Sequence, residues 1–171
     1  MDGGSDGGSC VNTIVEWPLD TRFHIPDTET PAYTSNPPVQ GPHYSSWARW
    51  RSYTDPVPRG HWVHNLEHGG VVFLYHPDAG TELVQALTRA YNAVPIGVAN
   101  HGCELHSRAV LTPDPLLDGL WAVTVSGPED GGMVGYYIKA DCIKSESDLT
   151  NFAVQHRGRA AEDLCDEGLW P

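Results

Sequence analysis

The apolar run Val71–Tyr75 constrains the fold of this chain more than any other stretch. Gly69 and Gly70 stand directly before the run, and His76-Pro77-Asp78 follows it. A short apolar run that is bounded by turn residues is typical of a buried strand. We therefore expect Val71–Tyr75 to be a central strand of a sheet.

Other segments have the spacing of strands and helices. Residues 81–94 have helical periodicity that Pro95 ends, and residues 145–156 form a second helical segment, capped by Ser145 or Ser147. Further strands are expected at residues 11–17, 109–112, 120–125 and 134–140. This order predicts an α+β domain with a mainly antiparallel or mixed sheet and two principal helices packed on it.

A long irregular segment precedes the central strand. Residues 18–42 are rich in Pro, Thr, Ser and Asp, and Asn36-Pro37-Pro38 cannot be helical. Such a segment is usually functional or pinned by packing. Residues 1–9 have the composition of a flexible Gly/Ser/Asp tether, so residues 10–171 are expected to form a single globular domain. The aromatic residues that would pin the segment are Tyr33, Tyr44, Trp47, Trp50 and Tyr53.

The charge of the chain narrows the classes of partner. Its formal net charge is −12, which disfavours nucleic acid and anionic membranes, because both reward clustered Lys and Arg. No apolar run has transmembrane length. A metal cation stays compatible with this charge, and we expect a monomer.

Four cysteines indicate an oxidising compartment. Cys10, Cys103, Cys142 and Cys165 lack CxxC spacing, which argues against a zinc ribbon or a thioredoxin-type motif. An even number in an exported domain indicates two disulfides. Three connectivities are possible, and we favour Cys142–Cys165 with Cys10–Cys103. Together with the tether, this predicts a secreted, periplasmic or cell-surface lipoprotein with a lipid anchor upstream; the alternative is four buried thiols in a cytosolic protein.

Three histidines form the candidate site. His64 and His68 lie four residues apart with Glu67 between them, and His43 stands upstream in a Pro- and aromatic-rich region. Imidazole suits copper and zinc at neutral pH, and three histidines leave a coordination position open. We predict a mononuclear copper or zinc site at His43, His64 and His68, with Glu67 as a fourth ligand or a partner that orients an imidazole. Met133 is a further candidate, as a soft axial ligand.

Other interpretations of these residues compete with the metal site. The histidines of a non-catalytic envelope scaffold would be hydrogen-bonded core residues that fix a turn. The sequence His64-Asn65-Leu66-Glu67-His68 also fits the H-x-x-E-H pattern of inverted zinc peptidases, but that pattern works on a helix, and flanking prolines and glycines argue against one here. A metal-independent hydrolase is weakened by the lack of a G-x-S-x-G motif. Whether the protein is an enzyme stays open.

The sequence gives less reason to expect the remaining histidines in the metal site. His61, His76 and His106 are expected at the surface, and His24 and His156 have no evident partner in the sequence.

Several motifs resemble a family of bacterial exported proteins, the domain-of-unknown-function 3105 family. The matching blocks are Tyr33-Thr34-Ser35-Asn36-Pro37-Pro38, Gly41-Pro42-His43-Tyr44, Val63-His64-Asn65-Leu66-Glu67-His68-Gly69 and Leu116-Leu117-Asp118. The resemblance covers roughly the chain from Cys10 to Cys165. It implies an exported or membrane-tethered domain of no established activity and makes His43, His64 and His68 the motif histidines. The chain departs from the pattern at Ser126-Gly127, where a Trp is expected before the glycine, and in the insertion that follows.

Overall fold

One mixed sheet of five strands runs through the computed structural model, which describes residues 10–97, 106–127, 134–160, 162 and 164–171. The strand order is β1-β5-β4-β2-β3; β2 pairs with β3 in parallel, and the other pairs are antiparallel. The predicted α+β class with a mixed sheet is thus confirmed. The strands are β1 (Ile14–Pro18), β2 (Val71–Tyr75), β3 (Ala109–Pro113), β4 (Trp121–Val125) and β5 (Val134–Ala140).

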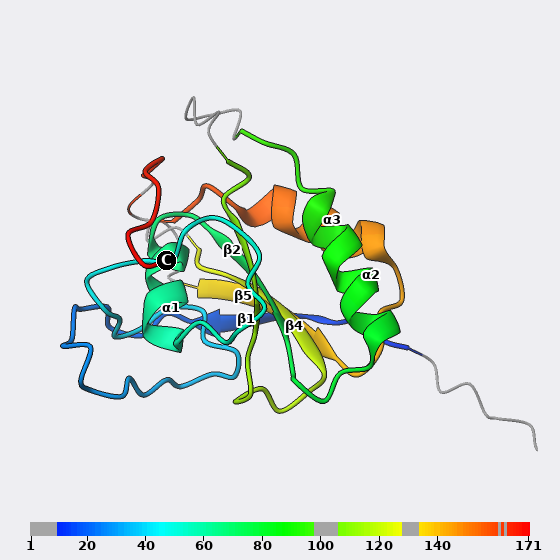
Figure 1. Cartoon of the computed structure of the whole chain (residues 1–171), viewed down its shortest axis with the longest axis horizontal. Helices are drawn as coiled ribbons and strands as arrows, with labels where there is room; N and C mark the ends of the chain where they lie inside the picture. The colour runs from blue at the N-terminus through cyan, green and yellow to red at the C-terminus, as the bar shows by residue number, and fades with distance from the viewer. Residues whose placement is uncertain (1–9, 98–105, 128–133, 161, 163) are drawn as a thin grey trace, which may run out of the picture.

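Strand β2 lies inside the sheet and contributes side chains to a separate hydrophobic core on each face. Val71 and Phe73 belong to the core under helices α2 (Thr81–Asn92) and α3 (Glu146–His156). Val72 and Leu74 belong to the opposite core, with helix α1 (Arg59–Glu67) and the irregular segment. Successive side chains of a strand point to opposite faces, so the unbroken apolar run of β2 fills both cores. The two sides are visible in Figure 1, where α1 lies apart from α2 and α3.

The two helices predicted from the sequence are present. Helix α3 begins after Ser145, whose Oγ accepts a hydrogen bond from the Asp148 amide at 3.3 Å, so Ser145 and not Ser147 is the cap. Helix α2 ends at Asn92, shortly before Pro95.

Helix α1 was not predicted, and the argument against it was wrong. Pro58 stands at its N-cap, where the missing amide hydrogen costs nothing, and the glycines begin only after His68. Residues 60–67 of α1 are all buried, so the helix has no polar face and no amphipathic period that a sequence could display. The chain therefore has three helices in the described residues.

The preferred disulfide pairing was also wrong. Cys10 bonds to Cys142, with 5.9 Å between the Cα atoms, which excludes both Cys10–Cys103 and Cys142–Cys165. Cys165 is also disulfide-bonded, and Cys103 lies outside the described residues. Spacing alone does not fix connectivity, because the pairing depends on the sheet: Cys10 precedes edge strand β1, and Cys142 follows its neighbour β5.

Several sequence predictions fall on parts of the chain outside the described residues. The tether at residues 1–9, the insertion at 128–133 and Met133 within it are among them. No helix of the described residues combines the length and the apolar character that crossing a bilayer requires.

Candidate metal centre

Four side chains converge where the irregular segment crosses α1. One ligand atom each from His24, His43, His64 and Glu67 lies within 4.8 Å of the others. Helix α1 supplies His64 and Glu67, which are three residues apart and so share a helical face. The irregular segment supplies His24, and His43 directly follows the segment; the two histidines face each other across a parallel bridge in which the Ile25 amide donates to the His43 carbonyl at 2.8 Å.

The hydrogen bonds of His43 and His64 fix which ring nitrogen faces the cluster. Nδ1 of His43 lies 2.8 Å from the carbonyl oxygen of Gly41, and Nδ1 of His64 lies 2.6 Å from that of Tyr44. A carbonyl oxygen only accepts, so each Nδ1 carries a proton and donates it. In the neutral ring the lone pair is then on Nε2, which faces Glu67 in both residues.

Glu67 stands between the two imidazoles. Its Oε2 lies 2.9 Å from His43 Nε2 and 3.7 Å from His64 Nε2, and its Oε1 lies 3.4 Å from Arg22 Nη1. The side chain of Glu67 is 7 % exposed and that of His43 is 1 % exposed. The 2.9 Å between His43 Nε2 and Glu67 Oε2 is short enough for a direct attraction between the two side chains.

Burial keeps His64 neutral. It lowers the pKa of His64 to about 3, and neighbouring His43 and His68 lower it further against the opposing effect of the Tyr44 carbonyl and Glu67. Burial of Glu67 alone would raise its pKa, but the hydrogen-bonding and charge effects of His43, with the charges of His64 and Arg22, outweigh burial and lower it. Near neutral pH the centre therefore offers a neutral imidazole beside an ionised carboxylate.

His68 lies next to the centre but in a second group. Its ring centroid is 4.6 Å from that of His64, yet its ligand atom groups with Glu67 and Glu162 rather than with His24 and His43. Nδ1 of His68 donates to the carbonyl of Glu162 at 3.1 Å, and Nε2 is buried without a hydrogen-bond partner among the described residues. Burial lowers the pKa of His68, partly offset by the Glu162 carbonyl and by the charges of Glu67 and Glu162. The structure thus brings His43 and His64 into one group and His68 into its neighbour.

A cavity of about 430 Å³ opens onto both groups. Its walls combine the histidines and carboxylates with Trp47, whose ring lies 5.1 Å from His64 and 4.6 Å from His68 between centroids. The cavity therefore borders the side chains of both groups, although Nε2 of His43 and of His68 is itself buried. The lining residues are Arg22, Phe23, His24, His43, Ser45, Trp47, His64, Glu67, His68, Glu162 and Leu164.

The H-x-x-E-H pattern lies in the last turn and at the C-cap of a helix, whereas the flanking prolines and glycines were expected to prevent one. His64 is in the last turn of α1, and His68 is its C-cap residue. The ligand atoms of these two histidines nevertheless fall into different groups, which share only Glu67. The arrangement therefore differs from one ion held by both histidines of the pattern.

Two histidines expected at the surface are buried elsewhere. His61 is 4 % exposed, and its Nδ1 donates to the Ser46 carbonyl at 2.7 Å. His106 is 7 % exposed and stacks on Trp50 with 4.8 Å between ring centroids. Neither residue lines the cavity. The two histidines are therefore outside the candidate site, but they are buried packing residues and not surface residues as expected.

Sequence reasoning missed two residues of the groups, His24 and Glu162. His24 is exposed and lies in an irregular segment, where no local pattern marks a ligand. Glu162 lies in an acidic tail and resembles its exposed neighbours. Only the long-range bridge between His24 and His43 and the docking of the tail on α1 could have identified them.

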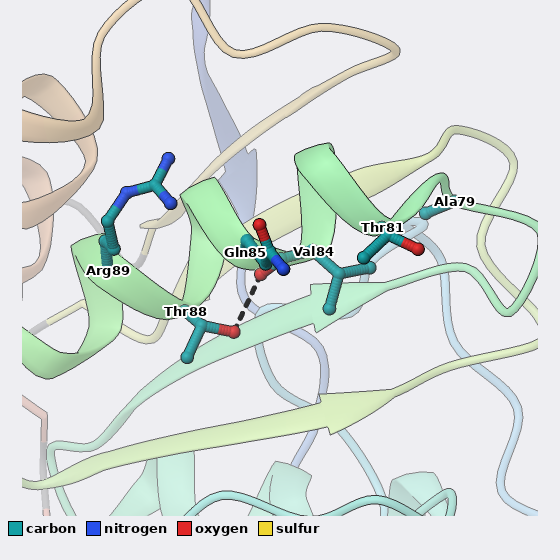
Figure 2. Close-up of a pocket in the computed structure, with 6 residues that line it drawn as sticks. All are labelled: Ala79, Thr81, Val84, Gln85, Thr88 and Arg89. Carbon is teal, nitrogen blue, oxygen red and sulfur yellow. Dashed lines mark hydrogen bonds between the residues drawn. The ribbon is translucent and has the colours of Figure 1, made fainter.

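A second hollow, of about 400 Å³, lies along α2 (Figure 2). Its one charged group, Arg89, pairs with Glu146 of α3 at 2.6 Å, and Thr88 Oγ1 donates to the Val84 carbonyl at 2.7 Å. This lining has no group of His, Cys, Asp or Glu side chains that could hold a metal ion, in contrast to the histidine cavity. The residues drawn are Ala79, Thr81, Val84, Gln85, Thr88 and Arg89.

Comparison with known proteins identifies a family without assigning an activity. A family described as "Protein of unknown function (DUF3105)" matches residues 24–162, which include every potential ligand of both groups. No curated protein and no solved structure matches the chain. The match spans most of the sequence, and the chain belongs to the DUF3105 family.

Proposed function

We propose that this protein binds a transition-metal ion, zinc or copper, through His24, His43, His64 and Glu67. The sequence prediction of a histidine site is kept, with His24 in place of His68 among the ligands of this ion. The ligand set is three imidazoles and one carboxylate, which is within the range of mononuclear zinc and copper sites in proteins.

The observation that carries the proposal is the pairing of Nδ1 with backbone carbonyls. Metal-binding histidines typically donate their second ring N–H to a carbonyl or carboxylate, which fixes the tautomer and turns the other nitrogen toward the ion. His43 and His64 both donate Nδ1–H to a carbonyl and direct Nε2 at the same carboxylate oxygen. Two lone pairs and a carboxylate oxygen repel one another unless a proton or a metal ion lies among them.

The proposed site is an exchangeable or catalytic site rather than a closed structural one. Among the described residues no cysteine sulfur joins the group, and a nitrogen and oxygen set favours Zn(II) or Cu(II) over Cu(I). The cavity beside the ligands leaves room for water or a substrate at the ion. An ion held in this way can polarise a bound ligand or lower the pKa of a bound water.

We also propose that the protein works outside the cytoplasm, as a secreted, periplasmic or cell-surface protein. The Cys10–Cys142 disulfide and the bonded state of Cys165 support this location, because disulfides persist in oxidising compartments. Purification from a periplasmic or secreted fraction with no titratable thiols is the expected result. Free thiols in the native protein would argue for the cytosol.

The test of metal binding is elemental analysis of untagged protein after Zn(II) or Cu(II) loading and desalting. We expect at least one equivalent in the natural chain and loss of the tightly bound equivalent in His64→Asn. Asparagine Nδ2 can take the place of imidazole Nδ1 at the Tyr44 carbonyl, so this variant removes the ligand and keeps the hydrogen bond.

His61→Asn is the matched control. It is the same change in the same helix, and His61 also donates Nδ1–H to a carbonyl, but it does not line the cavity. Full metal retention in His64→Asn would overturn the proposal. No retained metal in the natural chain would leave the scaffold interpretation, in which Glu67 and His43 form a structural ion pair.

A further inference from the structure

Glu67 belongs to both groups of potential ligands. One group contains Glu67 with three histidines, and the other contains Glu67 with His68 and Glu162. A carboxylate has two oxygens and can bind one ion with each, as it does in two-metal sites where the ions are about 3.5–4 Å apart. Glu67, which is common to both groups, is thus a candidate bridging ligand; its Oε2 faces His43 and His64, and an ion at its Oε1 would share that oxygen with Arg22 Nη1, which lies 3.4 Å away.

The second group includes His68, whose Nε2 is buried. Its side chain is 3 % exposed, and Nε2 has no hydrogen-bond partner in the part of the chain that the structure describes. Leaving such a buried group unpaired is unfavourable, whereas a bound cation would satisfy it. The other nitrogen, Nδ1, donates to the carbonyl of Glu162, which is the orientation that backbone carbonyls give to metal-binding histidines.

Glu162 is held against α1 by its backbone, which leaves its carboxylate available. Its amide donates to the Glu67 carbonyl at 3.2 Å, and its carbonyl accepts from His68 Nδ1 at 3.1 Å. Gly158 makes a further bond of this tail, donating to the Gly69 carbonyl at 2.7 Å. The side chain of Glu162 is 52 % exposed and reaches within 4.0 Å of His68 Nδ1. Two backbone bonds therefore fix the residue at the mouth of the cavity.

From these contacts we infer that the cavity holds a second divalent cation, bound by Glu67, His68 and Glu162, with Glu67 bridging the two ions. The inference rests on the proposed function for the first ion. The second site has two carboxylates and one imidazole, so it is richer in oxygen than the first. It is also the weaker site, because it has three ligands, one of them half exposed, and because two dications repel each other.

The experiment is equilibrium dialysis of metal-free protein against increasing Zn(II), with zinc counted by elemental analysis. The natural chain is expected to bind one equivalent tightly and a second at higher Zn(II). Glu162→Gln should keep the first equivalent and lose the second. Asp166→Asn is the control, since it removes the same charge from an exposed residue of the same tail that does not line the cavity.

Each outcome is decisive for a different claim. No bound zinc in the natural chain contradicts the proposed function itself. One equivalent in both the natural chain and Glu162→Gln retains the proposed function and overturns the second site. Loss of all zinc in Glu162→Gln also overturns it, because Glu162 would then belong to the first site.

A second measurement tests the separation of the ions. With Cu(II) as the probe, two ions joined by one carboxylate broaden each other's electron paramagnetic resonance spectrum. The broadening should appear between one and two equivalents in the natural chain and in Asp166→Asn, and be missing in Glu162→Gln. A second equivalent that binds without broadening would place that copper elsewhere and overturn the bridged arrangement.

Discussion

Nε2 of His43 lies 2.9 Å from Oε2 of Glu67, although the Nδ1 proton of His43 is already directed at the Gly41 carbonyl. The contact is therefore attractive only when His43 is doubly protonated or when a metal ion lies between the two side chains. A metal ion would replace the proton and also satisfy His64, which stays neutral. Glu67 is thus the residue on which the proposed metal binding should depend most.

Glu67→Gln should abolish stabilisation by metal. A ligand that binds only the folded state adds about 2.7 kcal/mol at a concentration 100 times its Kd. We expect Zn(II) to raise the Tm of the natural chain in a saturable way and to leave Glu67→Gln unchanged. Thermal denaturation with and without Zn(II) measures this, and Glu82→Gln, at an exposed position in the first turn of α2, is the control. An equal rise in Glu67→Gln would show that the zinc binds elsewhere.

The metal-free protein should lose stability as the pH falls from about 6.5 to about 3. Burial lowers the pKa of His64 to about 3 in the folded state, whereas the unfolded chain takes up the proton near 6.5. Between these values the unfolded state binds more protons, so the free energy of unfolding decreases with decreasing pH. His68 acts in the same direction. The contribution of His64 is on the order of 3 kcal/mol, allowing for solvent access through the cavity.

Urea denaturation at several pH values, in the presence of a chelator, measures this slope. His64→Asn has no group that titrates in the range, so its unfolding free energy should depend less on pH. An identical slope in the variant would mean that His64 is protonated in the folded protein.

Trp47 should report Cu(II) binding by fluorescence. Its ring lies 5.1 Å from that of His64, and it is the tryptophan that lines the cavity. A bound Cu(II) ion quenches a nearby indole strongly and distant ones weakly. We expect most of the Cu(II)-dependent quenching to be lost in Trp47→Phe, whereas Trp121→Phe, in the core under α3, keeps it. Equal quenching in both variants would place the copper away from the cavity.

Gly60→Ala should weaken metal binding from a distance. A Cβ atom at Gly60 would lie 2.5 Å from the ring of Tyr44, and the Tyr44 carbonyl orients His64. Such a clash typically costs about 1–3 kcal/mol. The Tyr44 ring must move, and we expect this movement to displace the Tyr44 carbonyl as well, which would lower both the stability and the Zn(II) affinity. Gly80→Ala is the control, because its Cβ would meet nothing within 4 Å. Denaturation and Zn(II) titration of both variants check the result; unchanged Zn(II) affinity in Gly60→Ala would contradict the role of Tyr44.

The sheet could be predicted from the sequence because its signals are local. Strands β2 and β5 have the predicted bounds, since both are short, largely apolar runs with β-branched or aromatic residues that lie beside turn residues. Helix α1 could not be predicted from periodicity, because it is buried on all sides. The prolines that precede α1 argue against a helix only when their position is ignored, because Pro58 at the N-cap is compatible with a helix.

The candidate site was only partly predictable for a related reason. His43, His64 and Glu67 stand in recognisable motifs and converge, whereas His24 and Glu162 reach them through pairing of segments that are distant in sequence. The disulfides follow the same rule, since Cys10 meets Cys142 only through the pairing of β1 with β5. Such contacts depend on how distant segments pair in the folded chain, and no local sequence pattern indicates them.

The potential ligands come from three distant stretches of chain: the irregular segment, helix α1 and the C-terminal tail. An ion shared by them would act as a reversible cross-link, closing long loops in the way that a disulfide does and lowering the entropy of the unfolded chain. The lifetime of the folded molecule would then follow the free metal concentration around it. A protein built in this way would persist where metal is plentiful and be cleared by proteases where metal is scarce.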